Sequence, residues 1–156
     1  GATAIDAGVI AISNSTALGA AGGAGTTISS GAAVNVSGSL TFAEAFNING
    51  TGIADDGALR NISGNNTLSG AITLGGATRI NSDSGTLTLS GTKTGTGQAL
   101  TVGGTGNVTI ATNGLNTGAG GTLTKDGTGT LTISAASNYT GATTINAGVV
   151  AISNAT

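Results

Sequence analysis

The side chains that carry most enzymatic and metal chemistry are scarce in this sequence. It contains no His and no Cys, which removes Ser-His-Asp and Cys-His catalysis, zinc sites and iron–sulfur sites together. Polysaccharide-cleaving enzymes instead need clustered carboxylates, but only Asp55 and Asp56 stand next to each other. We therefore expect no catalytic residue, no cofactor and no metal ligand, and we predict that the chain is not an enzyme.

Asp55 and Asp56 lie in the short sequence IADDG. Adjacent residues on a strand point to opposite faces, so the pair fits a polar turn better than a general acid and its base. Carboxylate and carbonyl oxygens could also bind calcium there, although the G-G-x-G-x-D calcium repeat is absent. A β-helical hydrolase or lyase is accordingly the least favoured function.

The other charged residues are interpreted as single exposed charges that keep the protein soluble and hold strands in register. They are Glu44, Arg60, Arg79, Asp83 and Lys93. Lys125 and Asp126 are adjacent and are predicted to form a solvated corner pair of little energetic value. The net charge of −2 and the lack of a basic patch argue against nucleic acid as a partner.

Eight N-x-[ST] sequences could accept glycans on an exported protein. They begin at Asn14, Asn35, Asn49, Asn61, Asn65, Asn107, Asn138 and Asn154. A chain rich in Asn, Ser and Thr also forms such triplets by accident, so Asn ladders and turns are the preferred interpretation.

Composition favours strands as the elements that position these residues. The chain of 156 residues is 38% hydrophobic but only 2% aromatic and 6% charged, with 30 Gly and no Pro. Small and β-branched residues without bulky aromatics fit a narrow β-structure better than a large globular core. No apolar run approaches the roughly 20 residues of a membrane span, and no basic-then-apolar leader opens the chain. A repetitive chain without thiols suits an extracellular location.

Short runs that alternate apolar and polar residues predict strands with one buried face. The runs are Val34–Val36, Leu40–Phe42, Phe46–Ile48, Ile72–Leu74, Leu87–Leu89, Leu100–Val102, Val108–Ile110 and Leu131–Ile133. Glycines between them, such as Gly75-Gly76, Gly103-Gly104 and Gly127, are predicted to form sharp corners, and the small-residue stretch Ala17 to Gly25 a loop or corner. Three runs per coil give a β-solenoid with roughly 20 residues per turn. A β-sandwich or barrel is less favoured because its core needs bulkier side chains.

One element occurs at both ends of the sequence. Gly1 to Thr16 reads GATAIDAGVIAISNST and Gly141 to Thr156 reads GATTINAGVVAISNAT, so 12 of 16 positions match at an offset of 140 residues. This indicates one period of a tandem array. About seven turns, spaced about 4.8 Å apart, would give a rise of about 34 Å per period.

The residues from Gly120 to Thr156 resemble the autotransporter-associated β-strand repeat, also called the passenger-associated transport repeat. Two motifs carry the resemblance. The G-x-L-x-K-x-G-x-G-T-L part is represented by Gly121, Leu123, Lys125, Gly127, Gly129, Thr130, Leu131, Ile133 and Ser134. The N-x-Y-x-G-x-T-x-I part is represented by Asn138, Tyr139, Gly141, Thr143, Ile145, Gly148 and Val150. Residues 1–16 are interpreted as the tail of a preceding repeat, residues 17–119 as divergent turns and residues 120–156 as the repeat motif.

The resemblance implies a right-handed parallel β-helix in the passenger of a bacterial surface protein, exported and often adhesive. In this motif, Leu123, Leu131, Ile133, Ile145, Val150 and Ile152 are expected to point inward. Thr122, Thr124, Thr130 and Thr132 are expected to point outward, and Tyr139 to cover a corner and give its hydroxyl a partner.

Three functions follow as hypotheses. The first is a structural shaft or fibre repeat that associates with itself head to tail and extends or mediates adhesion. The second is a module that binds a surface glycan or protein. The third is an ice-binding solenoid, because Thr-x-Thr recurs at residues 86/88, 92/94, 122/124 and 130/132; the irregular spacing of these pairs predicts that they lie on different faces.

Overall fold

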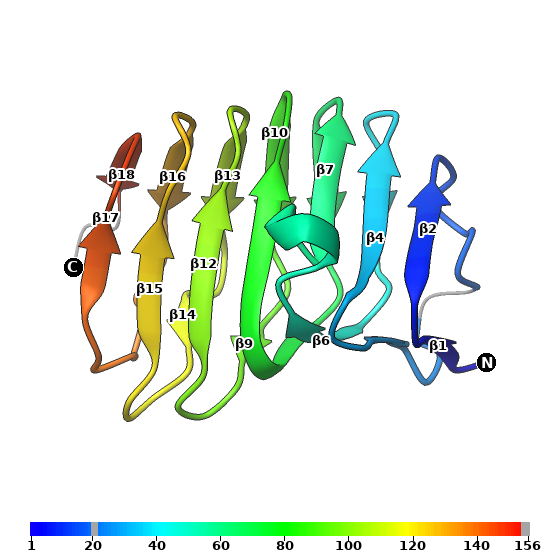
Figure 1. Ribbon diagram of the computed structural model, residues 1–156, viewed down its shortest axis with the longest axis horizontal. Coiled ribbons are helices and arrows are strands. Elements are labelled where there is room, and N and C mark those ends of the chain that lie inside the picture. Colours follow the sequence, from blue (N-terminus) through cyan, green and yellow to red (C-terminus); the bar gives the residue numbers. More distant parts are fainter. Residues whose placement is uncertain (20–21, 154–156) are drawn as a thin grey trace.

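The computed structural model describes residues 1–19 and 22–153 as a coil of parallel strands (Figure 1). The chain winds through about 7 turns of about 22 residues each, and the strands pair with strands of the turn before or after them, most of them on both sides. The strands nearest the viewer in Figure 1 run upward, the chain returns behind them, and each new turn lies to the left, so the coil is right-handed. The predicted β-solenoid is confirmed, with turns slightly longer than expected.

The coil has three faces, which the chain visits in a fixed order. The short-strand face comes first in each turn and consists of β1 (Thr3–Ile5), β3 (Thr26–Ile28), β6 (Phe46–Gly50), the first part of β9 (Ile72–Ser82), β11 (Lys93–Thr94) and β14 (Leu115–Asn116). The ion-pair face follows with β2 (Gly8–Ile12), β4 (Ala32–Ser37), β7 (Leu59–Ser63), the second part of β9, β12 (Ala99–Gly103), β15 (Thr122–Lys125) and β17 (Thr143–Ile145). The threonine face completes the turn with β5 (Thr41–Phe42), β8 (Asn66–Leu68), β10 (Thr86–Leu89), β13 (Asn107–Ile110), β16 (Thr130–Ile133) and β18 (Val149–Ile152).

The core consists of columns of like side chains stacked in register inside the coil. One column on the threonine face is formed by Phe42, Leu68, Leu89, Ile110, Ile133 and Ile152. All of these except Ile152, in the last described turn, are buried. Because parallel strands with a two-residue period keep the same residues inward in every turn, a narrow interior can be filled by Ile, Leu and Val alone.

The inward phase predicted for the C-terminal motif is confirmed for Leu123, Leu131 and Ile133, and Val150 packs against the core, whereas Ile145 and Ile152 in the last described turn are exposed. Leu123, Leu131 and Ile133 are buried, while the intervening threonines are half-buried on the outer surface. The Tyr139 ring packs against the core, and its hydroxyl lies 2.8 Å from the hydroxyl of Thr143.

Two kinds of glycine corner occur. Gly104 and Gly127 have positive φ angles of 96° and 70°, and a Cβ on Gly127 would lie 2.5 Å from the Gly104 carbonyl oxygen, so only glycine fits. Gly75 and Gly76, in contrast, lie within β9, which continues unbroken from the short-strand face to the ion-pair face. Their φ angles are not positive, and Gly75 instead makes room for the side chains of Asn49 and Asn47, whose Oδ1 atoms a Cβ there would meet.

The one helical segment in the described residues is a single 3-10 turn, η1 (Ile53–Asp55), which projects from the ion-pair face between β6 and β7 (Figure 1). No helix in ranges 1–19 and 22–153 is long and apolar enough to cross a bilayer. Residues 13–19 and 22–25 contain no strand, so the predicted loop over Ala17 to Gly25 is confirmed for its described part.

Replacing Leu131 by Asp should be among the most destabilising single substitutions in the chain. Leu131 is fully buried and stacks between Val108 and Val150, so the carboxylate would stay in the interior at a cost of several kcal/mol. The matched change Thr132→Asp places the same charge one residue away on the outer surface and should cost about 0.5 kcal/mol or less. Urea unfolding curves measure both; equal losses would show that the inward phase is wrong.

Candidate functional site

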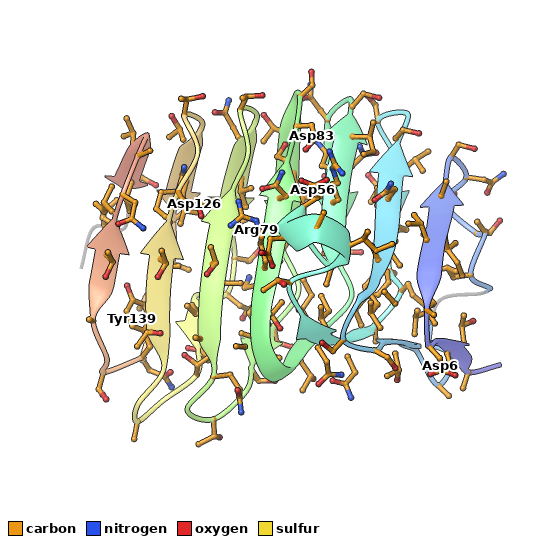
Figure 2. All side chains as sticks on the ribbon, viewed as in Figure 1. Asp6, Asp56, Arg79, Asp83, Asp126 and Tyr139 are labelled. Atoms are coloured by element: carbon orange, nitrogen blue, oxygen red, sulfur yellow. The ribbon has the colours of Figure 1, made fainter. Side chains whose placement is uncertain are left out.

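The densest group of polar side chains lies on the ion-pair face and is called here the ion-pair ladder. It is formed by Asp56, Arg60, Arg79, Asp83 and Asp126, which are five of the ten charged residues of the chain. Figure 2 shows four of them, Asp56, Arg79, Asp83 and Asp126, on the same side of the coil. They come from β7, β9, the η1 loop and two corners, so they are distant in sequence but adjacent in space.

Arg60 joins the first part of the ladder. Its Nη1 lies 2.9 Å from Asp56 Oδ2, and its Nη2 lies 2.8 Å from Asp83 Oδ2. Asp83 in turn accepts a hydrogen bond of 2.9 Å from Asn81 Nδ2. The Arg60 guanidinium thus ties the η1 loop to the strand of its own turn and to the corner of the next turn.

Arg79 continues the ladder across two turns. It binds the Asp126 carboxylate with both terminal nitrogens, at 2.7 and 2.8 Å, and donates a weaker bond of 3.3 Å to Asn81. β12 lies between Arg79 and Asp126, and its residue next to the ion pair is Gly103, which pairs with Asn81. A Cβ there would collide with the side chains of Arg79, Asp126 and Asn81, so the missing side chain is what lets the pair pass over β12.

The ladder has the character of a structural clamp. Its three carboxylates outnumber its two guanidiniums by one, and each guanidinium is already paired with carboxylates. An arginine with bidentate carboxylate partners has little capacity left for an anionic ligand. The geometry therefore stabilises contacts between turns and offers no acid–base pair.

Asp55 and Asp56, the carboxylate pair singled out in the sequence, point to separate partners. Asp55 accepts a hydrogen bond from the Thr51 hydroxyl within the η1 loop, and Asp56 pairs with Arg60. The polar-turn interpretation is confirmed, since Ala54 and Asp55 have φ angles of 53° and 60° in a tight loop. In the part of the chain that the structure describes, no three acidic side chains gather around a point that could hold a metal ion.

Two lysines predicted to be exposed lie inside the coil. Lys93 and Lys125 are each 1% exposed. Lys93 Nζ donates to the Leu89 carbonyl at 3.0 Å, and Lys125 Nζ donates to the carbonyls of Asp126 and Gly127 at 2.5 and 2.8 Å. Their apolar stems fill core positions while the ammonium groups bind corner carbonyls that face inward.

The prediction of a solvated Lys125–Asp126 pair is therefore wrong, because the Asp126 carboxylate turns outward to Arg79. The sequence contained a signal for this: Lys125 follows Leu123 by two residues and so lies in the inward phase. Burial lowers the pKa of Lys93 from 10.5 to about 8. It also lowers the pKa of Lys125, an effect that Asp126 opposes and Arg79 reinforces.

Glu44 is a third charged residue that was predicted to be exposed and is instead buried. It accepts a hydrogen bond of 2.7 Å from the Thr26 hydroxyl, which is also buried. It borders a hollow of about 210 Å³ on the side of the first turn that lacks a strand, lined also by Ile12, Leu18 and Phe42. The hollow is mainly apolar and contains no second titratable group.

The threonine face carries an uninterrupted column of outward threonines. The column is formed by Thr41, Thr67, Thr88, Thr109 and Thr132, paired in register from turn to turn. Of the four Thr-x-Thr pairs, residues 86/88 and 130/132 share this face, whereas 122/124 lies on β15 of the ion-pair face and Thr94 on β11 of the short-strand face. The prediction that the pairs lie on different faces is thus correct for two of them and wrong for the other two.

The column of outward threonines could not be seen in the spacing of the Thr-x-Thr pairs, because Thr41, Thr67 and Thr109 belong to no such pair.

Asparagines of the N-x-[ST] sequences mostly bind the backbone of neighbouring residues or turns. Asn65 and Asn107 accept hydrogen bonds from the backbone of Thr86 and Thr130 one turn later, at 3.0 Å each. Asn61 is buried and donates to Ser82 and to the carbonyls of Gly64 and Ser84. These contacts favour the interpretation as Asn ladders and turns; Asn154 lies outside the described residues.

Fold and site together define a parallel β-solenoid whose polar groups mainly join successive turns. Residues 123–152 match the family model of the passenger-associated-transport-repeat. This match confirms the resemblance seen in the motif of residues 120–156. No curated protein and no solved structure matches the chain at a significant level.

The stability of the coil should rise between about pH 8 and pH 10.5. The pKa of Lys93 is about 8 in the folded chain, whereas its ordinary value is 10.5. Between these two pH values Lys93 is mostly neutral in the folded chain but protonated in the unfolded chain. Because the unfolded state binds more protons in this window, the free energy of unfolding rises with pH. Since one pKa unit corresponds to about 1.4 kcal/mol, the gain from Lys93 should be on the order of 2–3 kcal/mol. Urea unfolding measured at successive pH values tests this.

The Lys93→Met variant provides the control for that measurement. Methionine keeps the length of the side chain between Ile72 and Leu115 but cannot be protonated, so the variant should be more stable at pH 7 and lose most of the alkaline rise. An unchanged pH profile in this variant would contradict the assignment of the rise to Lys93.

Proposed function

We propose that this segment is a non-catalytic shaft unit of an exported bacterial surface protein, in which copies of the unit stack head to tail. A passenger-type repeat and a β-solenoid fold both support a structural role. We further propose an extracellular location, at the cell surface or secreted. The partners we propose are neighbouring copies of the unit and, through its surface, a glycan or protein.

The comparison of the two terminal elements carries this proposal. Ile5 and Ile12 are 4% and 2% exposed because the following turn covers them, whereas their equivalents Ile145 and Ile152 are 54% and 66% exposed. The same sequence is therefore buried where a further turn follows and open where none is described. The element at the C-terminal end presents strand edges and apolar side chains shaped to receive another turn.

A chain with two 140-residue units should be clearly more stable to denaturant than a chain with one. The second unit covers the apolar end of the first and adds an interface, and in a linear array such interfaces increase stability cooperatively. Unfolding midpoints in urea and sedimentation at high concentration provide the measurements. Equal midpoints, together with a strictly monomeric single unit, would mean that each unit folds independently of its neighbours and that the shaft proposal is wrong.

A second candidate function is adhesion through the threonine face. Its outward column of five threonines is uncharged and regular, with about 4.8 Å between turns. Hydroxyl and methyl groups repeated at this spacing fit a ligand that is itself periodic or rich in hydroxyl groups, such as a polysaccharide. A regular threonine surface could also bind ice, but a second row of threonines beside the column is incomplete. It contains only Thr86 and Thr130, and Asn107 lies between them.

Binding to the threonine face should be strongly weakened by the double variant Thr88→Lys/Thr109→Lys. Two long charged side chains in the middle of the column would prevent flat contact, so we expect a loss of about tenfold or more in affinity on a glycan array, as for central contact residues. The control variant Thr101→Lys/Thr124→Lys places the same charges in neighbouring turns of the ion-pair face. Equal losses in both variants, or none in either, would exclude the threonine face as the binding surface.

A further inference from the structure

The two copies of the terminal element occupy different faces of the coil. In the first copy, β1 pairs with β3 on the short-strand face and β2 pairs with β4 on the ion-pair face. In the second copy, β17 pairs with β15 on the ion-pair face and β18 pairs with β16 on the threonine face. Each strand of the second copy is therefore displaced by one face in the direction that the chain winds.

The displacement leaves the inward and outward positions unchanged. Ile5 stacks on Ile28, and its equivalent Ile145 stacks on Lys125, both in inward columns. Likewise Ile12 stacks on Val36, and its equivalent Ile152 stacks on Ile133. Because a slip of one residue would have reversed every side chain, the change is a move to the next face of the coil without a change of side-chain phase.

The register gives the size of the displacement. Ile10 leads to Ile145 in six steps along one column of the ion-pair face, through Val34, Leu59, Ile80, Val102 and Lys125. Ile5 precedes Ile10 by one face. The interval from Ile5 to Ile145 is thus six turns and one face, not the about seven turns predicted from sequence.

We propose that successive copies of the 140-residue unit are related by a three-fold screw, each copy turned by one face relative to the copy before it. With about 4.8 Å per turn, the rise is about 30 Å per copy and the rotation about one third of a circle. This inference rests on the proposed function as a tandem shaft, because only a repeated unit generates the screw.

The screw determines which surfaces a shaft presents. Along any one side, the threonine face of one copy is followed by the ion-pair face of the next copy and then by the short-strand face of the third. The same face returns to a given side at every third copy. A ligand on a flat surface could then contact the threonine columns of every third copy only, whereas a soluble ligand could reach equal sites on all three sides.

Disulfide trapping in the existing chain tests the displacement, since the chain contains no Cys. Thr124 and Thr144 are outward neighbours in β15 and β17, and in-register neighbours about 4.8 Å apart are close enough for a disulfide. Had the second copy kept the faces of the first, Thr144 would instead follow Asn116 of β14, in the column of Ala4 and Thr27. The variants to compare are Thr124→Cys/Thr144→Cys and Asn116→Cys/Thr144→Cys, with Ala4→Cys/Thr27→Cys as the reference pair.

At low protein concentration and under a mild oxidant, the Thr124/Thr144 pair should form an intramolecular disulfide at a rate similar to the reference pair. It should form roughly tenfold or more faster than the Asn116/Thr144 pair, because the latter lies beyond disulfide distance. A faster or equal rate for the Asn116/Thr144 pair would overturn the screw. The result is independent of the melting comparison of one and two units: if the trapping succeeds and the midpoints are equal, the displacement stands and the cooperative shaft fails.

Discussion

Parallel stacking of successive turns in register is the constraint on which the rest of this structure depends. Strands pair with strands of neighbouring turns, so the same backbone bonds that form the sheet also align the columns of the core. A column needs only side chains of similar width, which explains why a chain with 2% aromatic residues can fold. The two phenylalanines that it has, Phe42 and Phe46, meet edge to face with ring centres 6.3 Å apart in the same interior.

The same stacking creates a difficulty at the corners, where carbonyls and amides face the interior without a strand partner. Polar side chains inside the coil meet this need. Lys125 binds two corner carbonyls, and Asn66 accepts a hydrogen bond of 2.6 Å from the Leu40 amide while donating to Asn61. Burial of these groups is thus compensated by hydrogen bonds, as a buried polar group requires. The lysine of the family motif has a structural role in this chain: it closes a corner.

Much of the fold could be predicted from the sequence, because alternation of apolar and polar residues directly reports the inward phase. The runs from Val34–Val36 to Leu131–Ile133 all fall on strands, except that Leu40 lies just before β5. The assignment of residues to faces could not be predicted, because turn length varies: Thr26 pairs with Phe46 after 20 residues, but Phe46 pairs with Ile72 after 26. The ion-pair ladder depends on these accumulated lengths, so Arg60, Arg79 and Asp83 looked like isolated charges in the sequence. The burial of Lys93 and Lys125 is unexpected for another reason, because a charged side chain normally lies at the surface, whereas here the alternation places both lysines inside the coil.

Variable turn length also explains how a repeat of 140 residues can differ from a whole number of turns. All three faces use the same alternation, so the strand Thr143–Ile145 fits beside Leu123–Lys125 as well as its equivalent Thr3–Ile5 fits beside Thr26–Ile28. The η1 loop projects from only one face, which makes each unit asymmetric, and in a solenoid small deviations per repeat accumulate into curvature. If every copy kept the same orientation, these deviations would add in one direction and bend the shaft. Under the proposed rotation by one face per copy, the deviations would be distributed around the axis, so that three copies would cancel their bends and the shaft would remain straight.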